Sequence, residues 1–204
     1  YSQLTEGRVF GNGELAQVFN DSNHTQVIDV PPWSDCNFNT WAAGRHMGAH
    51  AHGMLQIIHV IAGRMEVDWG DGWREAKAGY VHIQPAGASH SLRTFKGHEQ
   101  FGLNFTESRD ERGVLEAICE TFPSPTVVRM PFRAEWRRVL ADGNRGRRGD
   151  RLLRLHMLED YCIALLNAAE GRDDVSAARL MMDFLTAHCQ RPVRVDEVAD
   201  AIHV

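Results

Sequence analysis

The stretch GRHMGAHAHGMLQIIHVIAG, residues 44–63, combines four histidines with a run of branched apolar residues. Side chains two residues apart on a β-strand share a face, so we expect His50, His52 and Gln56 on one face of a strand. Two imidazoles at this spacing can bind one metal ion together. The stretch therefore predicts a β-strand that carries part of a metal site.

A second stretch, GYVHIQPAGASHSLRT at residues 79–94, supplies a further histidine after a Pro-Ala-Gly turn. Across a barrel it can bring His90 against the first strand. This predicts a site of three histidines, with Gln56 as a fourth, oxygen-donating ligand. The matching cofactor is a divalent transition metal, either zinc, nickel, iron or manganese. A site of neutral imidazoles and an amide leaves the dication's charge uncompensated and favours an anionic ligand.

Three other polar residues bear on this site. Thr94 shares strand parity with His90, and we expect it to face the ligand. His46 lies on the same face of the strand as His50, unless Gly48 forms a bulge. We therefore expect His46 at the mouth of a ligand pocket. A position on the surface or in the core is an equally good alternative. His59 falls on the opposite face, where it would serve packing. An alternative interpretation involves no metal: the histidines line the pocket as hydrogen-bonding groups.

Around these stretches the first hundred residues are typical of β-structure. Short runs rich in Val, Ile, Phe and Trp alternate with Gly, Asp and Asn, and an Asp-Gly pair at residues 71–72 signals a hairpin. The expected strands are residues 17–19, 26–30, 38–41, 55–61, 65–69, 73–77, 80–84, 89–94 and 99–105. Many short strands with frequent turns indicate a mainly β sandwich or barrel.

Beyond residue 107 the apolar spacing changes to steps of three and four, which indicates helices. We expect them at residues 114–122, 132–140, 151–169 and 177–188, with Asp150 as the N-cap of the third. That third helix has two adjacent apolar stripes, which predicts a homodimer through it, with Leu155 and Leu158 in the interface.

Composition excludes several classes of protein. The chain has 204 residues, 43% of them hydrophobic, and a net charge of −5, which argues against a disordered chain. No apolar run approaches the length of a membrane span, and no signal peptide is visible at the start. Its four cysteines lie far apart, which predicts reduced thiols and a cytoplasmic location. An arginine-rich segment at residues 133–154 is either a solvated face or an anion-binding stripe.

Both histidine stretches resemble the two motifs of the cupin family. The first motif is matched by Gly44, His50, His52 and Gly63, with Gln56 where Glu is usual. The second is matched by Gly79, Pro85, Gly87 and His90, with Thr94 where Asn is usual. This resemblance implies a double-stranded β-helix, or jelly-roll, barrel with an internal site, followed by an α-helical connector.

Residues 178–185 and 193–202 resemble the first two helices of the DNA-binding domain of AraC-type transcription regulators, with Arg194 where an N-capping Ser is usual. The resemblance implies a cupin sensor barrel at residues 1–106, a helical connector and dimerisation region at 107–176, and the start of a truncated helix-turn-helix domain at 177–204. DNA would then be a partner of the full-length protein and not of this part, whose recognition helices would follow.

Two functions follow from these features. The first is the effector-sensing and dimerisation domain of an AraC-type regulator, with a small-molecule effector in the barrel. The second is a metal-dependent cupin enzyme, a dioxygenase or isomerase. The helices at the C-terminal end and the lack of a surplus carboxylate beside the histidines favour the regulator.

Overall fold

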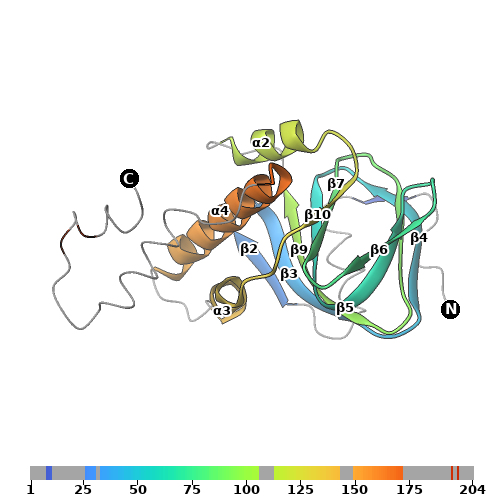
Figure 1. Ribbon diagram of the computed structural model, residues 1–204, viewed down its shortest axis with the longest axis horizontal. Coiled ribbons are helices and arrows are strands. Elements are labelled where there is room, and N and C mark those ends of the chain that lie inside the picture. Colours follow the sequence, from blue (N-terminus) through green and yellow to red (C-terminus); the bar gives the residue numbers. More distant parts are fainter. Residues whose placement is uncertain are drawn as a thin grey trace.

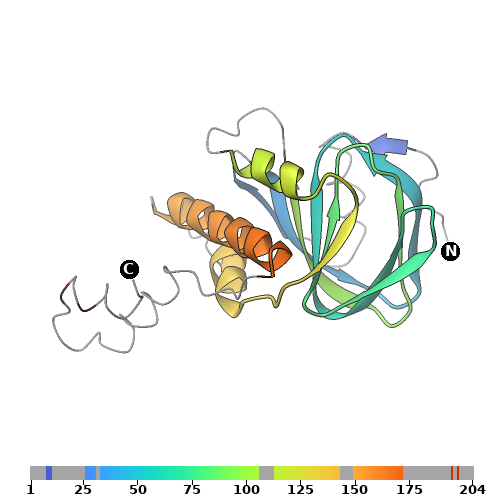
Figure 2. The same ribbon diagram turned by 45° about the horizontal axis from the view of Figure 1, so that its top comes forward.

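The computed structural model describes residues 8–10, 26–30, 33–105, 113–142 and 149–171, together with Arg194 and Glu197. Within them, ten strands form one continuous sheet that folds over on itself, and three helices lie together on one side of it (Figures 1 and 2). The mainly β barrel with a helical connector, as predicted, is confirmed.

Two halves of this sheet face each other across the barrel, and we call them sheet I and sheet II. Sheet I contains β1 (Arg8–Phe10), β4 (Arg45–His52), β6 (Trp73–Lys77), β8 (His90–Thr94) and the second part of β5 (Gln56–Asp68). Sheet II contains β2 (Gln26–Val30), β3 (Trp33–Trp41), β7 (Tyr80–Gln84), β9 (His98–Phe105), β10 (Thr126–Arg129) and the first part of β5. All pairs are antiparallel except β1 with β4.

Strand β5 joins the two sheets. Its first residues pair with β7 and β9, its last residues pair with β6 and β8, and the register shifts between Val60 and Ala62. Such an irregularity bends a strand, which lets one strand turn the corner of a barrel. Two strands were expected here, at 55–61 and 65–69. Gly63 instead continues the strand with a positive φ of 73°.

The outer face of sheet II packs against the helices α2 (Val114–Thr121), α3 (Ala134–Asp142) and α4 (Asp150–Ala169). Alternate residues of the strands, such as Ile57, Ile83 and Leu103, form one core with Trp136 and Leu158 of the helices. A strand whose apolar face is covered in this way buries most of its hydrophobic area on one side. The opposite face of the same strands therefore points into the barrel.

A partly buried polar contact at the edge of this core connects two of the helices. The Asp160 carboxylate on α4 accepts hydrogen bonds from Arg133 at 2.8 Å and from the Trp136 indole at 2.7 Å. Trp136 lies in the first turn of α3, and Arg133 directly precedes this helix. Part of the arginine-rich segment therefore serves ion pairs within the protein.

Several details differ from the expectations. Gly149, not Asp150, is the N-cap of α4, because the Gly149 carbonyl already accepts the Leu153 N–H at 2.9 Å. Leu158 is fully buried against the barrel, so its expected place in a dimer interface is wrong. Strands β1 and β10 were not expected. Both are short, and short strands carry little periodic signal.

Other expectations concern residues outside the described part of the chain. These are the strand at 17–19, the helix at 177–188 and, apart from Arg194 and Glu197, the segment 177–204. The three-part domain division stays a prediction. No helix in the described part of the chain is long and apolar enough to span a membrane.

Candidate metal centre

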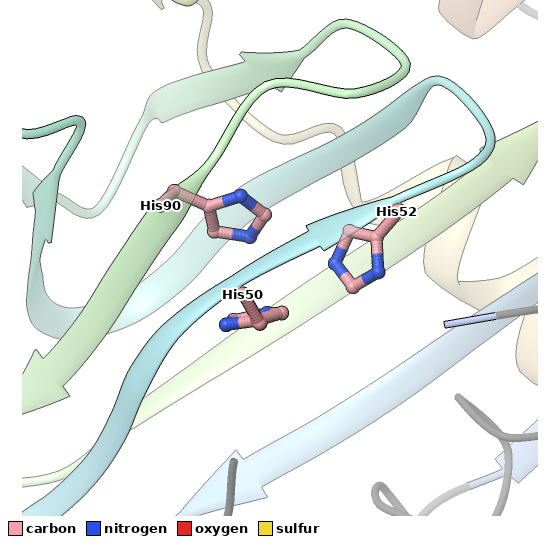
Figure 3. Close-up of side chains that lie close together, drawn as sticks. All are labelled: His50, His52 and His90. Carbon is pink, nitrogen blue, oxygen red and sulfur yellow. The ribbon is translucent and has the colours of Figure 1, made fainter. Parts of the chain in front are cut away.

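Three buried histidines come together on the inner face of sheet I (Figure 3). His50 and His52 lie at the end of β4, and His90 lies at the start of β8, directly opposite His50 in the register. Their ring centroids are 4.3 to 5.0 Å apart, and one ring nitrogen of each lies within 4.8 Å of the others. The residues expected to bind a metal from two separate stretches are therefore neighbours.

The turn before β8 contributes to this arrangement. The Gly87 N–H donates to the His52 carbonyl at 2.7 Å, so the Pro85–Gly87 turn is held against the end of β4. Gly87 has a φ of 79°, a conformation that glycine adopts without strain. This contact explains why a Pro-x-Gly turn three residues before His90 belongs to the site.

Backbone carbonyls orient two of the rings. Nδ1 of His50 lies 2.8 Å from the Gly48 carbonyl oxygen, and Nδ1 of His90 lies 3.1 Å from that of Ala88. A carbonyl only accepts hydrogen bonds, so each Nδ1 carries the proton and each Nε2 presents a lone pair. A histidine that ligates a metal is commonly oriented by this kind of second hydrogen bond.

Burial keeps the three imidazoles neutral. It lowers the pKa of His52 to about 3, and the neighbouring His90 and His50 lower it too. Burial likewise lowers the pKa of His90 to about 3, with His50 adding to the effect, and it lowers that of His50. Neutral imidazole is the form that binds a metal ion.

Gln56 lies beside this cluster, but it comes from sheet II, whereas we expected it on the same strand as His50 and His52. The chain leaves β4 at His52, turns through 53–55 and begins β5 at Gln56, so Gln56 belongs to sheet II and not to the strand of His50 and His52. Its side chain is buried and interacts with His52, which offsets part of the lowering of the His52 pKa.

Thr94 and His46, the two expected ligand-binding residues, lie away from the cluster. Thr94 is buried on the His90 side of β8, and its hydroxyl donates to the Arg64 carbonyl at 2.9 Å. His46 pairs with Arg93, which faces outward, and its ring lies 5.9 Å from that of Trp73. A register shift between Met47 and His50, the bulge that was left open, separates His46 from the face of His50.

The inner face of sheet II holds polar residues that the sequence did not single out. His82, Gln84, His98 and Gln100 are all buried there. A signal was present, because histidine or glutamine stands at every second position in β7, at 82 and 84, and at the start of β9, at 98 and 100. Alternation of this kind normally marks a polar face exposed to solvent, so it does not by itself predict a buried polar wall.

The three-histidine cluster fits a divalent transition metal. It provides three neutral nitrogen donors, two of them with a defined tautomer, and the Nε2 of His90 is buried without a hydrogen-bond partner among the described residues. Buried polar atoms are nearly always satisfied, so such an atom calls for a ligand or water. His50, His52 and His90 can therefore hold the ion, with Gln56 next to them.

No protein-family model matches this chain, and no curated protein matches its sequence. Solved structures do show likenesses. A cupin-2 domain containing protein from Shewanella frigidimarina is 13% identical, with a TM-score of 0.38, over 48% of this chain and 94% of that one. A Cupin 2 conserved barrel domain protein from Salinispora arenicola is 21% identical, with a TM-score of 0.38, over 42% and 76%.

The EutQ protein of Clostridium difficile is 12% identical, with a TM-score of 0.37, over 42% of this chain and 69% of that one. The strand order, the paired sheets and the corner in β5 describe a barrel, and these cupin structures are the proteins to which it is similar. The chain is thus a mainly β barrel with a helical connector, and its sheet I carries three histidines that can bind a metal ion.

Proposed function

We propose that this protein binds a divalent transition metal through His50, His52 and His90 and senses a small anionic effector at that metal. The observation that carries the proposal is the convergence of three buried imidazoles from two strands, with the Nδ1 of two of them engaged by backbone carbonyls. Three protein ligands leave open positions, as in metal sites that bind an exchangeable ligand. The metal, when bound, supplies a positive charge that attracts an anion.

The protein's own residues set the remaining properties of the site. The Gly48 and Ala88 carbonyls hold two rings so that their lone pairs face the centre. Gln56 brings an uncharged amide where a carboxylate would neutralise part of the metal charge. This neutral ligand set favours a carboxylate or similar anion as effector.

We assign the effector signal to β5, which touches both the site and the helices. Gln56 on the inner face contacts His52, while His59, three residues on, lies on the outer face with Nδ1 3.2 Å from the Tyr161 hydroxyl of α4. A ligand shifts a conformational equilibrium only if it binds one state more tightly than the other. The connection through β5, from Gln56 to His59 and Tyr161, is the route by which a change at the site would reach the helices.

The regulator function adds partners to this picture. Residues 107–176 would connect and dimerise, residues 177–204 would begin a helix-turn-helix of the AraC type, and the full-length protein would bind DNA as a homodimer. The helices α2, α3 and α4 on the outer face of sheet II support a connector role, since they pack directly on strands whose inner face lines the barrel.

Selection from a pool of random DNA, using protein expressed from the complete natural reading frame, tests the regulator function. We expect enrichment of a defined motif with two half-sites, because a dimer reads DNA with its own symmetry. A pool that stays random after repeated rounds, at moderate salt, would contradict the regulator function and leave the metal site as an independent question.

A metal-dependent enzyme, a dioxygenase or isomerase, is the second candidate. The observation in its favour is that three imidazole ligands leave coordination positions for a substrate. Against it, the described part of the barrel buries no carboxylate that could act as general base; the buried carboxylate of the described residues, Asp150, begins α4. Chromatography of small carboxylic acids after incubation with the metal-loaded protein under air would reveal a product if the enzyme function is correct.

A further inference from the structure

Three polar residues on the inner face of sheet II lie beside the histidine cluster, and we call them the amide shelf: Gln56, His82 and Gln84. In the register, Gln56 of β5 is directly opposite Gln84 of β7, and His82 follows two residues away on the same face. The side chain of Gln56 interacts with His52, which places this end of the shelf directly beside the cluster. All three side chains are at most 2% exposed.

The hydrogen-bonding capacity of this shelf is defined. The Trp69 indole N–H donates to Gln84 Oε1 at 2.7 Å, and an indole cannot accept, so the amide orientation follows and Nε2 of Gln84 is a donor. That Nε2 has no partner among the described residues. Neither ring nitrogen of His82 has one there. The shelf thus offers donors and acceptors side by side.

The shelf also lacks formal charge. No lysine, arginine or carboxylate is buried inside the described part of the barrel. Arg45, a half-buried cation, lies at the far end of β4 from His52, with its guanidinium 5.7 Å from the Trp41 ring centre. A charged group placed against the shelf would lose its hydration without gaining a counter-ion, which is costly. An uncharged group that both donates and accepts would find partners.

We propose that the effector is a short monocarboxylate with an uncharged hydrogen-bonding group at its other end, such as a hydroxyl, which the amide shelf binds. This inference rests on the proposed metal centre for the carboxylate end, whereas the shelf itself determines the other end. Dicarboxylates of the same length do not belong to this class of effector. Among monocarboxylates, the proposal predicts that hydroxy acids bind more tightly than plain fatty acids.

Matched acids test the proposal. The probes are butyrate, 4-hydroxybutyrate and succinate, with valerate, 5-hydroxyvalerate and glutarate as the series one carbon longer. Titration calorimetry of zinc-loaded and metal-free protein gives their affinities, after metal content has been measured in each preparation. We expect, in at least one series, the hydroxy acid to bind about three- to tenfold tighter than the plain acid, the gain expected from one net hydrogen bond. The dicarboxylate should be the weakest of the three.

Two variants connect this preference to the shelf. Gln84→Met keeps the length of the side chain but removes its donor, and His82→Phe removes both ring nitrogens. Each should reduce the ratio between hydroxy acid and plain acid to about one while metal content stays at the wild-type level. His46→Phe is the matched control on the outer face of sheet I and should leave the ratio unchanged. Thermal unfolding of each variant shows that it is folded.

The outcomes separate this proposal from the proposed function. The ratio of affinities compares a hydroxy acid with a plain acid that has the same carboxylate. If the protein binds no metal, the proposed metal centre is refuted, but this ratio still measures the preference of the amide shelf. Equal affinities for hydroxy and plain acids in both series, a preference for the dicarboxylates, or no binding of any probe at tens of millimolar would overturn the proposal. A preference that survives both Gln84→Met and His82→Phe would do the same.

Discussion

Six histidines are buried in the described part of the protein, and their positions separate them by role. His50, His52 and His90 share the inner face of sheet I, whereas His59 faces the helices and contacts Tyr161 and Phe132. An imidazole in such surroundings is neutral at ordinary pH, because burial disfavours the charged ring. The same property suits a metal ligand and makes a packing histidine sensitive to acid.

His59 gives a prediction for pH dependence. Burial lowers its pKa to about 3 from the ordinary value of 6.5, although the Met130 backbone offsets part of this, and the facing Tyr161 stays protonated because burial raises its pKa. As pH falls below 6.5 the unfolded chain therefore binds a proton that the folded chain excludes. The folded state is fully stable above this range and loses stability as pH falls toward 3.

We expect His59→Phe to reduce this loss. Between about pH 6 and pH 4, the free energy of unfolding of the wild type should fall more steeply than that of the variant, by up to about 1.4 kcal/mol per pH unit. Urea unfolding at several pH values measures both slopes, and a difference at neutral pH does not affect the comparison. Parallel pH profiles would show that His59 is not the titrating group.

At the residue scale, the sequence predicted the three metal-ligand candidates because motif spacing places them at strand ends that must meet. It could not predict on which face of the sheet His46 lies. One extra residue in β4 moves the side chains before it to the opposite face. Nor did the sequence predict the amide shelf. The orientation of Gln84 depends on Trp69, fifteen residues earlier in the chain, and only the folded barrel brings the two together.

Among the elements, β5 is the one on which the barrel depends, since it belongs to both sheets. At its corner, a Cβ on Gly63 would lie 2.5 Å from the Gly97 carbonyl oxygen and 3.0 Å from the Cα of His98. These are backbone atoms at the start of β9 and in the residue before it, and they cannot move aside cheaply. The close approach of two strands explains why glycine stands here, besides its positive φ.

Gly63→Ala should therefore destabilise the protein more than Gly87→Ala. Both glycines have a positive φ, but a Cβ on Gly87 would meet nothing within 4 Å. Each variant loses about 1–2 kcal/mol through backbone strain, and Gly63→Ala should lose at least about 1 kcal/mol more through the clash. Chemical denaturation of the two variants gives the difference. Equal losses would mean that β5 and β9 can separate without cost.

The helices show what the periodicity of apolar residues can and cannot predict. The spacing of leucines predicted α4 to within one residue, because a 20-residue amphipathic segment carries a strong signal. Periodicity did not tell which of the two apolar stripes faces the barrel. Contacts with sheet II and with Trp136 decide this, and they bury Leu158 while leaving Leu152 and Ile163 on the other side.

For the whole molecule, the predicted homodimer through α4 would have to use the exposed side of this helix, because Leu158 is buried in the core. Leu152 is 56% exposed and Ile163 is 50% exposed, and they lie eleven residues apart, about three helical turns, on one side of the helix. We expect the wild type to sediment as a dimer and Ile163→Asp to sediment as a folded monomer, since a charge there would be buried only in the dimer.

Leu158→Asp is the matched comparison on the buried side of α4. It should unfold the protein or cost about 3 kcal/mol or more, because it places a carboxylate in the core shared by helices and barrel. Sedimentation with thermal unfolding separates the two effects. A wild type that stays monomeric at high concentration, or an Ile163→Asp variant that remains a dimer, would contradict an interface on this side of α4.

The metal content of protein purified without an affinity tag tests the central claim most directly, namely that His50, His52 and His90 form one metal centre. We predict about one divalent transition-metal ion per chain in the wild type. Metal should be lost in both His50→Ala/His52→Ala and His90→Ala and retained in His46→Ala, whose ring lies outside the cluster beside Trp73. Absence of metal above background in the wild type, or full retention in the double variant, would contradict the claim.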